Sequence, residues 1–341
     1  MSDLVSAHTA FQTLPVVDIS GLYSPDLQER QRAAERLGQA ARDVGFFYVT
    51  GHNMPRACIE ALVECAKAFF ALPIAEKMRH YIGHSTNHSG YVPEGEERFG
   101  DGKSVDRKEA YDIGLDAPTD APRRPLIGPN QWPSFPRFRE DVSAYYADAI
   151  ALSQVLFRGF ALALGLPEDA LARRATQPPS QLRLIHYPYD SNPQNNAQGI
   201  GSHTDYEGFT ILLPTAPGLE VINGAGDWID VPVLPDAFVV NIGDMMEVLS
   251  GGQFVATRHR VRKVQEERYS FPLFCALDYD EVIEPAVASA GNYTPLRCGD
   301  HIYAQTQQTF TYLKERLARG EAQLPADARA TDSFGRRELA D

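Results

Sequence analysis

The chain has 341 residues, of which 43% are hydrophobic and 23% are charged, so it can bury one large core and has the composition of a soluble globular protein. Its 45 acidic side chains against 32 lysines and arginines give a formal net charge of −13, which disfavours nucleic acid or an anionic membrane surface as a partner. The four cysteines show no zinc-type spacing and are expected to be free thiols. Because we find neither a membrane-spanning run nor a signal peptide, a cytoplasmic location is expected.

The N-terminal part alternates between strand and helix patterns. Residues 14–20 and 44–49 are rich in β-branched and aromatic side chains and predict two strands. Between them, Ser24-Pro25-Asp26 predicts an N-cap followed by a proline at the first helical position. A second helix is expected after Pro55, and residues 83–114 predict a long loop with short strands, of the kind that often carries function.

The second half of the chain is dominated by short strand patterns, after a long helix predicted at residues 138–164. The strands are expected at residues 209–213, 219–222, 228–233, 237–242 and 269–277. Many short strands broken by Pro, Gly and Asn indicate a mainly β fold, a sandwich or jelly roll with flanking helices. A final helix is predicted at residues 300–317, and residues 321–341 are expected to form a flexible tail.

The most informative motif is His203-Thr204-Asp205. Side chains at positions i and i+2 of an extended segment project to the same face, so His203 and Asp205 can reach one ion. His259 supplies a third donor if its strand pairs across the barrel. Two imidazoles and one carboxylate form the face that holds non-haem Fe(II) and leaves half of an octahedron open. An H-x-D pair alone arises often by chance, so the prediction depends on His259 joining it.

A second motif, Arg268-Tyr269-Ser270, follows His259 along the chain. The two-residue period of a strand places Arg268 and Ser270 on one face, where a planar guanidinium and a hydroxyl can grip a carboxylate. The alternative is a surface arginine and serine on an edge strand. The largely apolar run from Phe271 to Leu277 indicates instead a buried strand, and a buried arginine without an anion is costly. The motif therefore predicts a ligand with a carboxylate.

Together with further motifs, these residues resemble the 2-oxoglutarate/Fe(II)-dependent dioxygenases of the isopenicillin N synthase-like type. The resemblance covers about residues 14–315 and includes LPVVDI from Leu14, GFFYV from Gly45, KEAYD from Lys108 and NIGD from Asn241. It implies a distorted double-stranded β-helix, or jelly roll, with N-terminal and C-terminal helices packed outside. The expected organisation is one catalytic unit over residues 1–320, with an N-terminal α/β part at 1–120 and an iron-binding barrel core at 180–280.

The resemblance also implies a reaction and a set of site residues. Fe(II) is the implied metal, and 2-oxoglutarate and O₂ are the co-substrates of an oxidative decarboxylation coupled to hydroxylation, desaturation or cyclisation of a small organic molecule, as in secondary metabolism. The implied residues are His203, Asp205 and His259 as iron ligands, Arg268, Ser270 and Tyr187 at the far carboxylate of 2-oxoglutarate, and Asn241 near the iron. One departure is Ile185, which stands where many members carry asparagine, so further co-substrate contacts are not implied.

Three other functions are compatible with these motifs. The nearest is an oxidase of the same family that does not consume 2-oxoglutarate, since isopenicillin N synthase and aminocyclopropane-carboxylate oxidase both keep R-x-S. The others are a zinc hydrolase and a non-catalytic barrel that only binds a ligand. The candidate substrate contacts are Tyr91, Arg98, Phe99, Phe274 and Tyr279. They suit a small molecule with an acidic group, although ordinary packing is the alternative for each aromatic; the chain is expected to be a monomer or weak homodimer.

Overall fold

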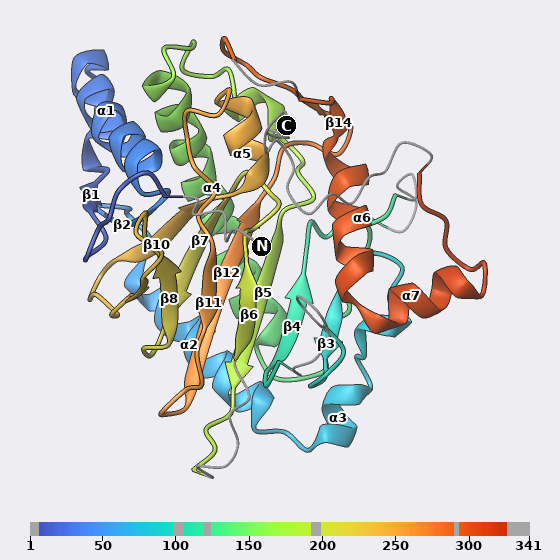
Figure 1. Cartoon of the computed structure of the whole chain (residues 1–341). Coiled ribbons are helices and arrows are strands. Elements are labelled where there is room, and N and C mark those ends of the chain that lie inside the picture. Colours follow the sequence, from blue (N-terminus) through green and yellow to red (C-terminus); the bar gives the residue numbers. More distant parts are fainter. Residues whose placement is uncertain (1–6, 98–105, 119–123, 192–198, 290–292, 326–341) are drawn as a thin grey trace.

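The computed structural model describes residues 7–97, 106–118, 124–191, 199–289 and 293–325. Two β-sheets form the centre of the molecule, and helices cover the outside (Figure 1). This is the mainly β architecture with flanking helices that the strand patterns predict.

The larger sheet has eight strands in the order β1-β2-β10-β7-β12-β5-β4-β3. They are β1 (Val16–Asp18), β2 (Phe46–Thr50), β3 (Gly90–Val92), β4 (Glu109–Ile113), β5 (Gln181–Tyr187), β7 (Phe209–Pro214), β10 (Phe238–Ile242) and β12 (Arg268–Cys275). The pair β1 and β2 is parallel, and the other neighbours are antiparallel. The four N-terminal strands thus extend both edges of the sheet, while β12 lies in its middle.

The smaller sheet has four antiparallel strands in the order β6-β11-β8-β9. They are β6 (Ile200–His203), β8 (Leu219–Ile222), β9 (Trp228–Asp230) and β11 (His259–Val261). Within this sheet His259 is the direct partner of His203. A two-stranded sheet of β13 (Val282–Ile283) and β14 (Leu296–Arg297) lies apart from both.

The helices cover the outer face of the larger sheet and one end of the barrel (Figure 1). They are α1 (Leu27–Asp43), α2 (Arg56–Phe70), α3 (Ile74–Met78), α4 (Phe138–Ala163), α5 (Asp244–Leu249), α6 (Cys298–Thr309) and α7 (Thr311–Ala318), with short 3-10 turns η1 (Ser20–Tyr23), η2 (Ile82–His84) and η3 (Ala172–Arg174). Helix α4 packs Phe157 and Phe160 against Phe209 of β7, with ring centroids 4.8 and 5.2 Å apart. This aromatic contact fixes the outer face of the sheet and leaves its inner face to the site.

The structure corrects two expected helix boundaries. Helix α1 begins at Leu27 and is capped by Asp26, whose carboxylate accepts a 2.9 Å bond from the Gln28 amide, so Ser24 is not the N-cap. The predicted final helix is two helices, α6 and α7, because Phe310 has an extended backbone and pairs with Glu97 instead. Most of the predicted tail, from residue 326 onward, lies outside the described residues.

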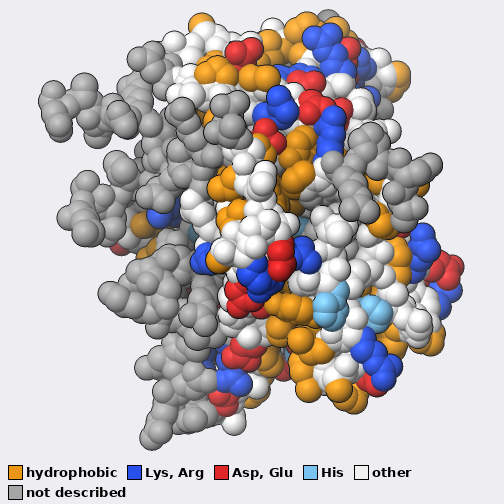
Figure 2. Space-filling view, turned by 90° about the vertical axis from the view of Figure 1, so that its right-hand side faces the viewer, with side chains coloured by type: hydrophobic (Ala, Val, Ile, Leu, Met, Phe, Trp, Pro, Cys, Tyr) orange, Lys and Arg blue, Asp and Glu red, His pale blue; other side chains and the backbone are white. Residues whose placement is uncertain are grey.

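On the face in Figure 2, the acidic and basic side chains of the described residues are interspersed and do not separate into a basic patch. That distribution agrees with the net negative charge and offers little attraction to a polyanion. Among the described residues, no helix is long and apolar enough to cross a membrane.

Candidate active site

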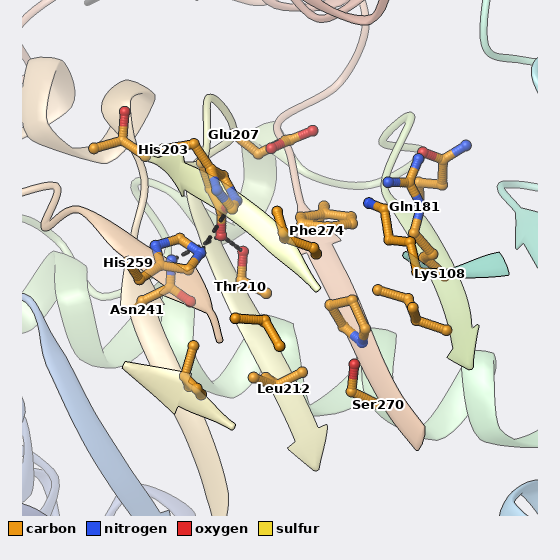
Figure 3. Close-up of a pocket in the computed structure, with 18 of the residues that line it drawn as sticks. Lys108, Gln181, His203, Glu207, Thr210, Leu212, Asn241, His259, Ser270 and Phe274 are labelled. Carbon is orange, nitrogen blue, oxygen red and sulfur yellow. Dashed lines mark hydrogen bonds and ion pairs between the residues drawn. The ribbon is translucent and has the colours of Figure 1, made fainter. Parts of the chain in front are cut away.

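Two histidines and one aspartate meet between the sheets (Figure 3). His203 ends β6, Asp205 follows it after one residue, and His259 begins the neighbouring strand β11. The Oδ1 atom of Asp205 lies 3.6 Å from the Nε2 atom of each histidine. One donor atom from each of the three residues lies within 4.8 Å of the others, so a single ion can touch all three.

The hydrogen bonds around these residues turn the remaining donor atoms toward one point. The Nδ1 atom of His203 donates to the Gly201 carbonyl at 2.8 Å, which leaves Nε2 as the acceptor of the ring. The other oxygen of Asp205, Oδ2, accepts from the Asn241 amide at 2.8 Å and from the Thr210 hydroxyl. With Oδ2 occupied in this way, Asp205 presents Oδ1 alone, as a one-oxygen ligand does.

Burial and charge shift the pKa of two of the three groups. Burial lowers the pKa of His259 to about 4, with the neighbouring His203 adding to the effect, so the ring of His259 is neutral near pH 7. Burial alone would raise the pKa of Asp205, but the two histidines and Asn241 hold that pKa well below its usual range. Two imidazoles beside one ionised carboxylate form a donor set that fits Fe(II). This set does not fit an ion that prefers oxygen ligands alone.

The predicted carboxylate grip lies in the opposite sheet. Arg268 and Ser270 are both 1% exposed on β12, and Tyr187 of β5 is the strand partner of Arg268. The Arg268 guanidinium carbon lies 4.6 Å from the centre of the Tyr187 ring, and its Nε donates to the Ala216 carbonyl at 3.1 Å. Its Nη1 is buried and has no hydrogen-bond partner among the described residues. A buried cation with an unused donor fits a ligand carboxylate, because such a donor is costly when left unpaired.

One cavity joins the histidine–aspartate cluster to this grip. Apolar residues of both sheets, including Leu212 and Val261, line part of it. Lys108, Gln181 and Phe274 line another part, away from Ser270 (Figure 3). A mostly apolar cavity with a few polar groups that converge on it is typical of sites for small molecules.

The predicted substrate contacts divide into three groups. Phe274 lines the cavity. Tyr91 and Tyr279 do not: the Tyr91 hydroxyl donates to Glu109, and the Tyr279 hydroxyl donates to Asp300 at 3.0 Å, so both rings pack elsewhere. Arg98 and Phe99 lie outside the described residues.

Several polar residues that line the cavity were not predicted as site residues, among them Glu97, Lys108, Gln181, Arg183 and Thr210. Two of them carried a readable signal, since Gln181 and Arg183 precede Tyr187 on β5 at two-residue intervals and so share its face. The other three come from segments that only the fold brings near.

Comparison with known proteins identifies the family. Residues 14–135 match the model for the non-haem dioxygenase in morphine synthesis N-terminal region, and residues 179–277 match the model for the 2OG-Fe(II) oxygenase superfamily. The chain is 34% identical over 314 residues to the 2-oxoglutarate-dependent dioxygenase tropC of Talaromyces stipitatus, covering 87% of this chain and 96% of that relative. The chain belongs to the 2OG-Fe(II) oxygenase superfamily.

Other members of the superfamily agree with this assignment. The chain is 32% identical to the homoarginine-6-hydroxylase 2-ODD-C23.1 of Arabidopsis thaliana, over 86% of this chain and 94% of the relative. The crystal structure of a 2OG-Fe(II) oxygenase family protein from Caulobacter crescentus superimposes with a TM-score of 0.75 at 28% identity, over 91% of this chain and 99% of the other. The predicted family, jelly-roll fold and enzyme class are confirmed, as are Fe(II) and 2-oxoglutarate as cofactor and co-substrate.

Proposed function

We propose that this 2OG-Fe(II) oxygenase holds Fe(II) through His203, Asp205 and His259 and grips the far carboxylate of 2-oxoglutarate through Arg268 and Ser270. The observation that carries the proposal is that one cavity holds both a metal-type donor set and a buried guanidinium. Three donor atoms converge on one point, and Arg268, whose Nη1 has no hydrogen-bond partner among the described residues, lines the same cavity. One chelated diacid would suit both.

The chain's own residues position and shield the reaction. When bound, Fe(II) with 2-oxoglutarate and O₂ supplies the oxidising chemistry, which the cofactor carries and not the protein. The imidazoles of His203 and His259 would each offer one nitrogen, and Asp205 would offer one oxygen while Thr210 and Asn241 hold the other. The guanidinium of Arg268 neutralises the distal carboxylate inside the barrel.

The overall reaction balances as 2-oxoglutarate, O₂ and substrate going to succinate, CO₂ and oxidised substrate. In a hydroxylation one oxygen atom enters succinate and the other enters the product. In a desaturation or ring closure the substrate loses two hydrogen atoms and the second oxygen leaves as water. The geometry of the described residues serves each outcome equally.

A small organic molecule is the substrate class that the comparisons favour. Relatives and neighbours carry names such as homoarginine-6-hydroxylase, and one solved neighbour at 26% identity, with a TM-score of 0.69, is JOX2 in complex with 2OG, Fe and JA. We also propose that residues 1–320 act as one catalytic unit, because β1 and β2 share a sheet with β12.

The test is an aerobic assay of the Fe(II)-loaded enzyme with a panel of small organic molecules, in which succinate and oxidised product are both quantified. We expect one succinate per oxidised product, and we expect replacement of His203, Asp205 or His259 by alanine to abolish product formation. Formation of oxidised product without succinate would instead indicate an oxidase of the same family that does not consume 2-oxoglutarate. Full turnover in any of the three alanine variants would reject the metal assignment.

A further inference from the structure

The cavity has a second end that 2-oxoglutarate does not reach. Residues at two-residue intervals on β12 line it from Arg268 to Phe274, and those on β5 line it from Tyr187 to Gln181. The partners at one end are Arg268 and Tyr187, and those at the other are Phe274 and Gln181. Six residues of antiparallel strand span about 20 Å, so a five-carbon diacid gripped by Arg268 cannot fill both ends. We call the end formed by Gln181, Phe274 and the ion cluster behind them the distal subsite.

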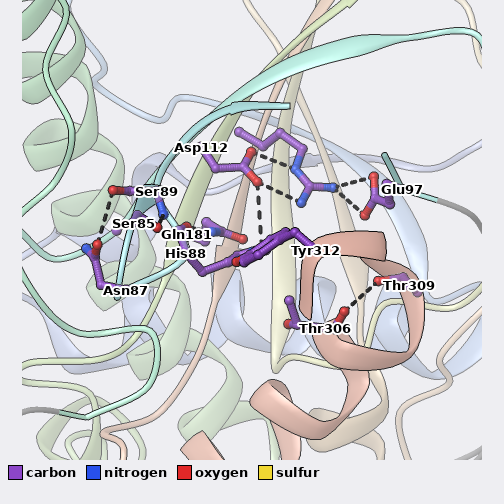
Figure 4. A network of polar contacts seen from close by, with 12 residues as sticks. Ser85, Asn87, His88, Ser89, Glu97, Asp112, Gln181, Thr306, Thr309 and Tyr312 are labelled. Carbon is purple, nitrogen blue, oxygen red and sulfur yellow. Dashed lines mark hydrogen bonds and ion pairs between the residues drawn. The ribbon is translucent and has the colours of Figure 1, made fainter. Parts of the chain in front are cut away.

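The ion cluster of the distal subsite consists of four buried charged groups, those of Arg183, Lys108, Glu97 and Asp112, of which Figure 4 labels the two carboxylates. The Arg183 guanidinium donates to both oxygens of Asp112 at 2.8 and 2.9 Å and to both oxygens of Glu97 at 2.8 and 3.0 Å. The Lys108 ammonium also donates to Glu97. Two cations therefore face two carboxylates, and the cluster is balanced in charge.

This balance determines which group of a substrate can lie against the cluster. The carboxylate of Glu97 stays ionised, because Arg183 and Lys108 lower its pKa to about 2 although burial alone would raise it. A charged group on the substrate would find no uncompensated opposite charge in this cluster, and burying it there would be costly. The cluster therefore favours an uncharged neighbour.

Two side chains of the distal subsite are less buried than the cluster and can touch that neighbour. Gln181 and Phe274 are cross-strand partners and both are partly exposed. The amide nitrogen of Gln181 donates to the His88 carbonyl at 2.9 Å, which fixes the amide orientation and leaves its oxygen as an acceptor. The Arg183 guanidinium carbon lies 5.8 Å from the centre of the Phe274 ring, so the ring contacts the ion cluster through Arg183.

We propose that Gln181 and Phe274 select the primary substrate, and that they select an uncharged aromatic or heteroaromatic ring carrying an N–H or O–H donor. The ring packs against Phe274, and its donor bonds to the Gln181 oxygen. Neither an acid nor an amine satisfies both the neutral cluster and this acceptor. This inference rests on the proposed function, because it assigns the other end of the cavity to 2-oxoglutarate.

The test measures ligand binding to the anaerobic enzyme loaded with Fe(II) and 2-oxoglutarate, by ligand-observed NMR. The probes are phenol, anisole, benzoate, benzylamine and cyclohexanol, which vary donor, charge and ring in turn. Phenol is expected to bind most tightly. Tighter binding of benzoate or benzylamine, equal binding of cyclohexanol, or no binding of phenol overturns the proposal.

A pair of glutamine variants locates the contact. Gln181→Leu is expected to weaken the binding of phenol about three- to ten-fold, which corresponds to the loss of one hydrogen bond, and to leave the binding of anisole unchanged. Gln154→Leu is the matched control, because its amide also donates to a backbone carbonyl, that of Ala175 at 2.6 Å, but does not line the cavity. Unchanged phenol affinity in Gln181→Leu overturns the assignment.

The affinity for 2-oxoglutarate distinguishes a failure of the substrate proposal from a failure of the proposed function. It also shows whether a variant is folded, because only a folded cavity binds the co-substrate. The dissociation constant of 2-oxoglutarate is expected to stay within about two-fold of wild type in Gln181→Leu, since Arg268 and Ser270 lie at the other end of the cavity. If Gln181→Leu does not fold, Phe274→Leu takes its place and is expected to remove the preference for phenol over cyclohexanol; a retained preference overturns the proposal. Failure of wild type to bind 2-oxoglutarate would instead reject the proposed function.

Discussion

Replacing Arg268 with methionine should weaken the binding of 2-oxoglutarate. The same change should leave the stability of the ligand-free protein unchanged or raise it. Arg268 is 1% exposed, its Nη1 has no hydrogen-bond partner in the part of the chain that the structure describes, and burial lowers its pKa, so the cation is poorly compensated before a ligand binds. Removing an unsatisfied buried donor returns about 1–3 kcal/mol, and losing the Nε bond to Ala216 costs about 1 kcal/mol. The metal-free variant should thus be more stable than wild type by about 0–2 kcal/mol.

The same substitution should strongly reduce the affinity for 2-oxoglutarate. Removing one member of a buried charge pair costs about 2–5 kcal/mol, which is a rise of roughly 30- to 5,000-fold in the dissociation constant. Two assays measure the two effects, urea unfolding of the metal-free protein and anaerobic titration of the Fe(II) enzyme with 2-oxoglutarate. Arg56→Met is the control, because Arg56 forms an exposed pair with Glu60 at 2.8 Å whose loss should leave both measurements almost unchanged.

Either of two results would refute this reasoning. An unchanged dissociation constant would mean that Arg268 binds something other than the co-substrate. A metal-free variant less stable than wild type by more than about 2 kcal/mol would mean that the guanidinium already has a full set of partners.

Three further predictions concern the metal ligands, the ion cluster and a buried histidine. Thr210→Val should lower Fe(II) affinity about 10- to 100-fold in an anaerobic metal titration, because Asp205 loses a bond that orients it. Arg183→Met should cost about 3–5 kcal/mol in urea unfolding, since it leaves the buried carboxylate of Asp112 without its cation and leaves Glu97 with Lys108 alone. Burial first, and Arg183 second, lower the pKa of His88 to about 3. Its ring is neutral in the folded chain but takes a proton near pH 6.5 when unfolded, so its contribution to stability is complete above pH 6.5 and is lost as the pH falls toward 3, by about 1.4 kcal/mol per unit. His88→Asn, which suits the left-handed backbone there (φ +59°), should remove that slope in urea unfolding at pH 6.5 and 4.5.

Matched variants test the first two of these predictions. Thr176→Val removes a similar hydroxyl bond, to Asp278 at 2.7 Å, and should leave Fe(II) affinity unchanged. Arg139→Met breaks an exposed pair with Asp116 and should cost less than about 1 kcal/mol. An equal loss in the control and test variants, or an unaltered pH slope in His88→Asn, would contradict the corresponding argument.

The sequence predicted the parts of the site that depend on short spacing. His203 with Asp205, and Arg268 with Ser270, each project to one face because a strand repeats every two residues. The structure brings His259 beside His203 through strand pairing, as the motif required. These features are local or follow from a single pairing, and such patterns are readable in one sequence.

The ion cluster could not be predicted in the same way. Arg183 meets Asp112 and Glu97 across 71 and 86 residues of chain, and no local pattern links the three. The break between α6 and α7 has the same origin, because Phe310 leaves the helix to pair with Glu97. Tyr91 and Tyr279 do not line the cavity, because their hydroxyls bond to Glu109 and Asp300, and an isolated aromatic in a sequence carries no signal of which neighbour it packs on.

Strands β5 and β12 run the length of the cavity with the diacid grip at one end and the distal subsite at the other. Side chains near their far ends can therefore be exchanged by evolution, or by an engineer, while the oxidising centre is inherited unchanged. Under the assignments made here, new substrates would require edits at alternate positions of two neighbouring strands, such as 181 and 274, with no redesign of the metal site. Diversification within such a scaffold then becomes a matter of a few point mutations.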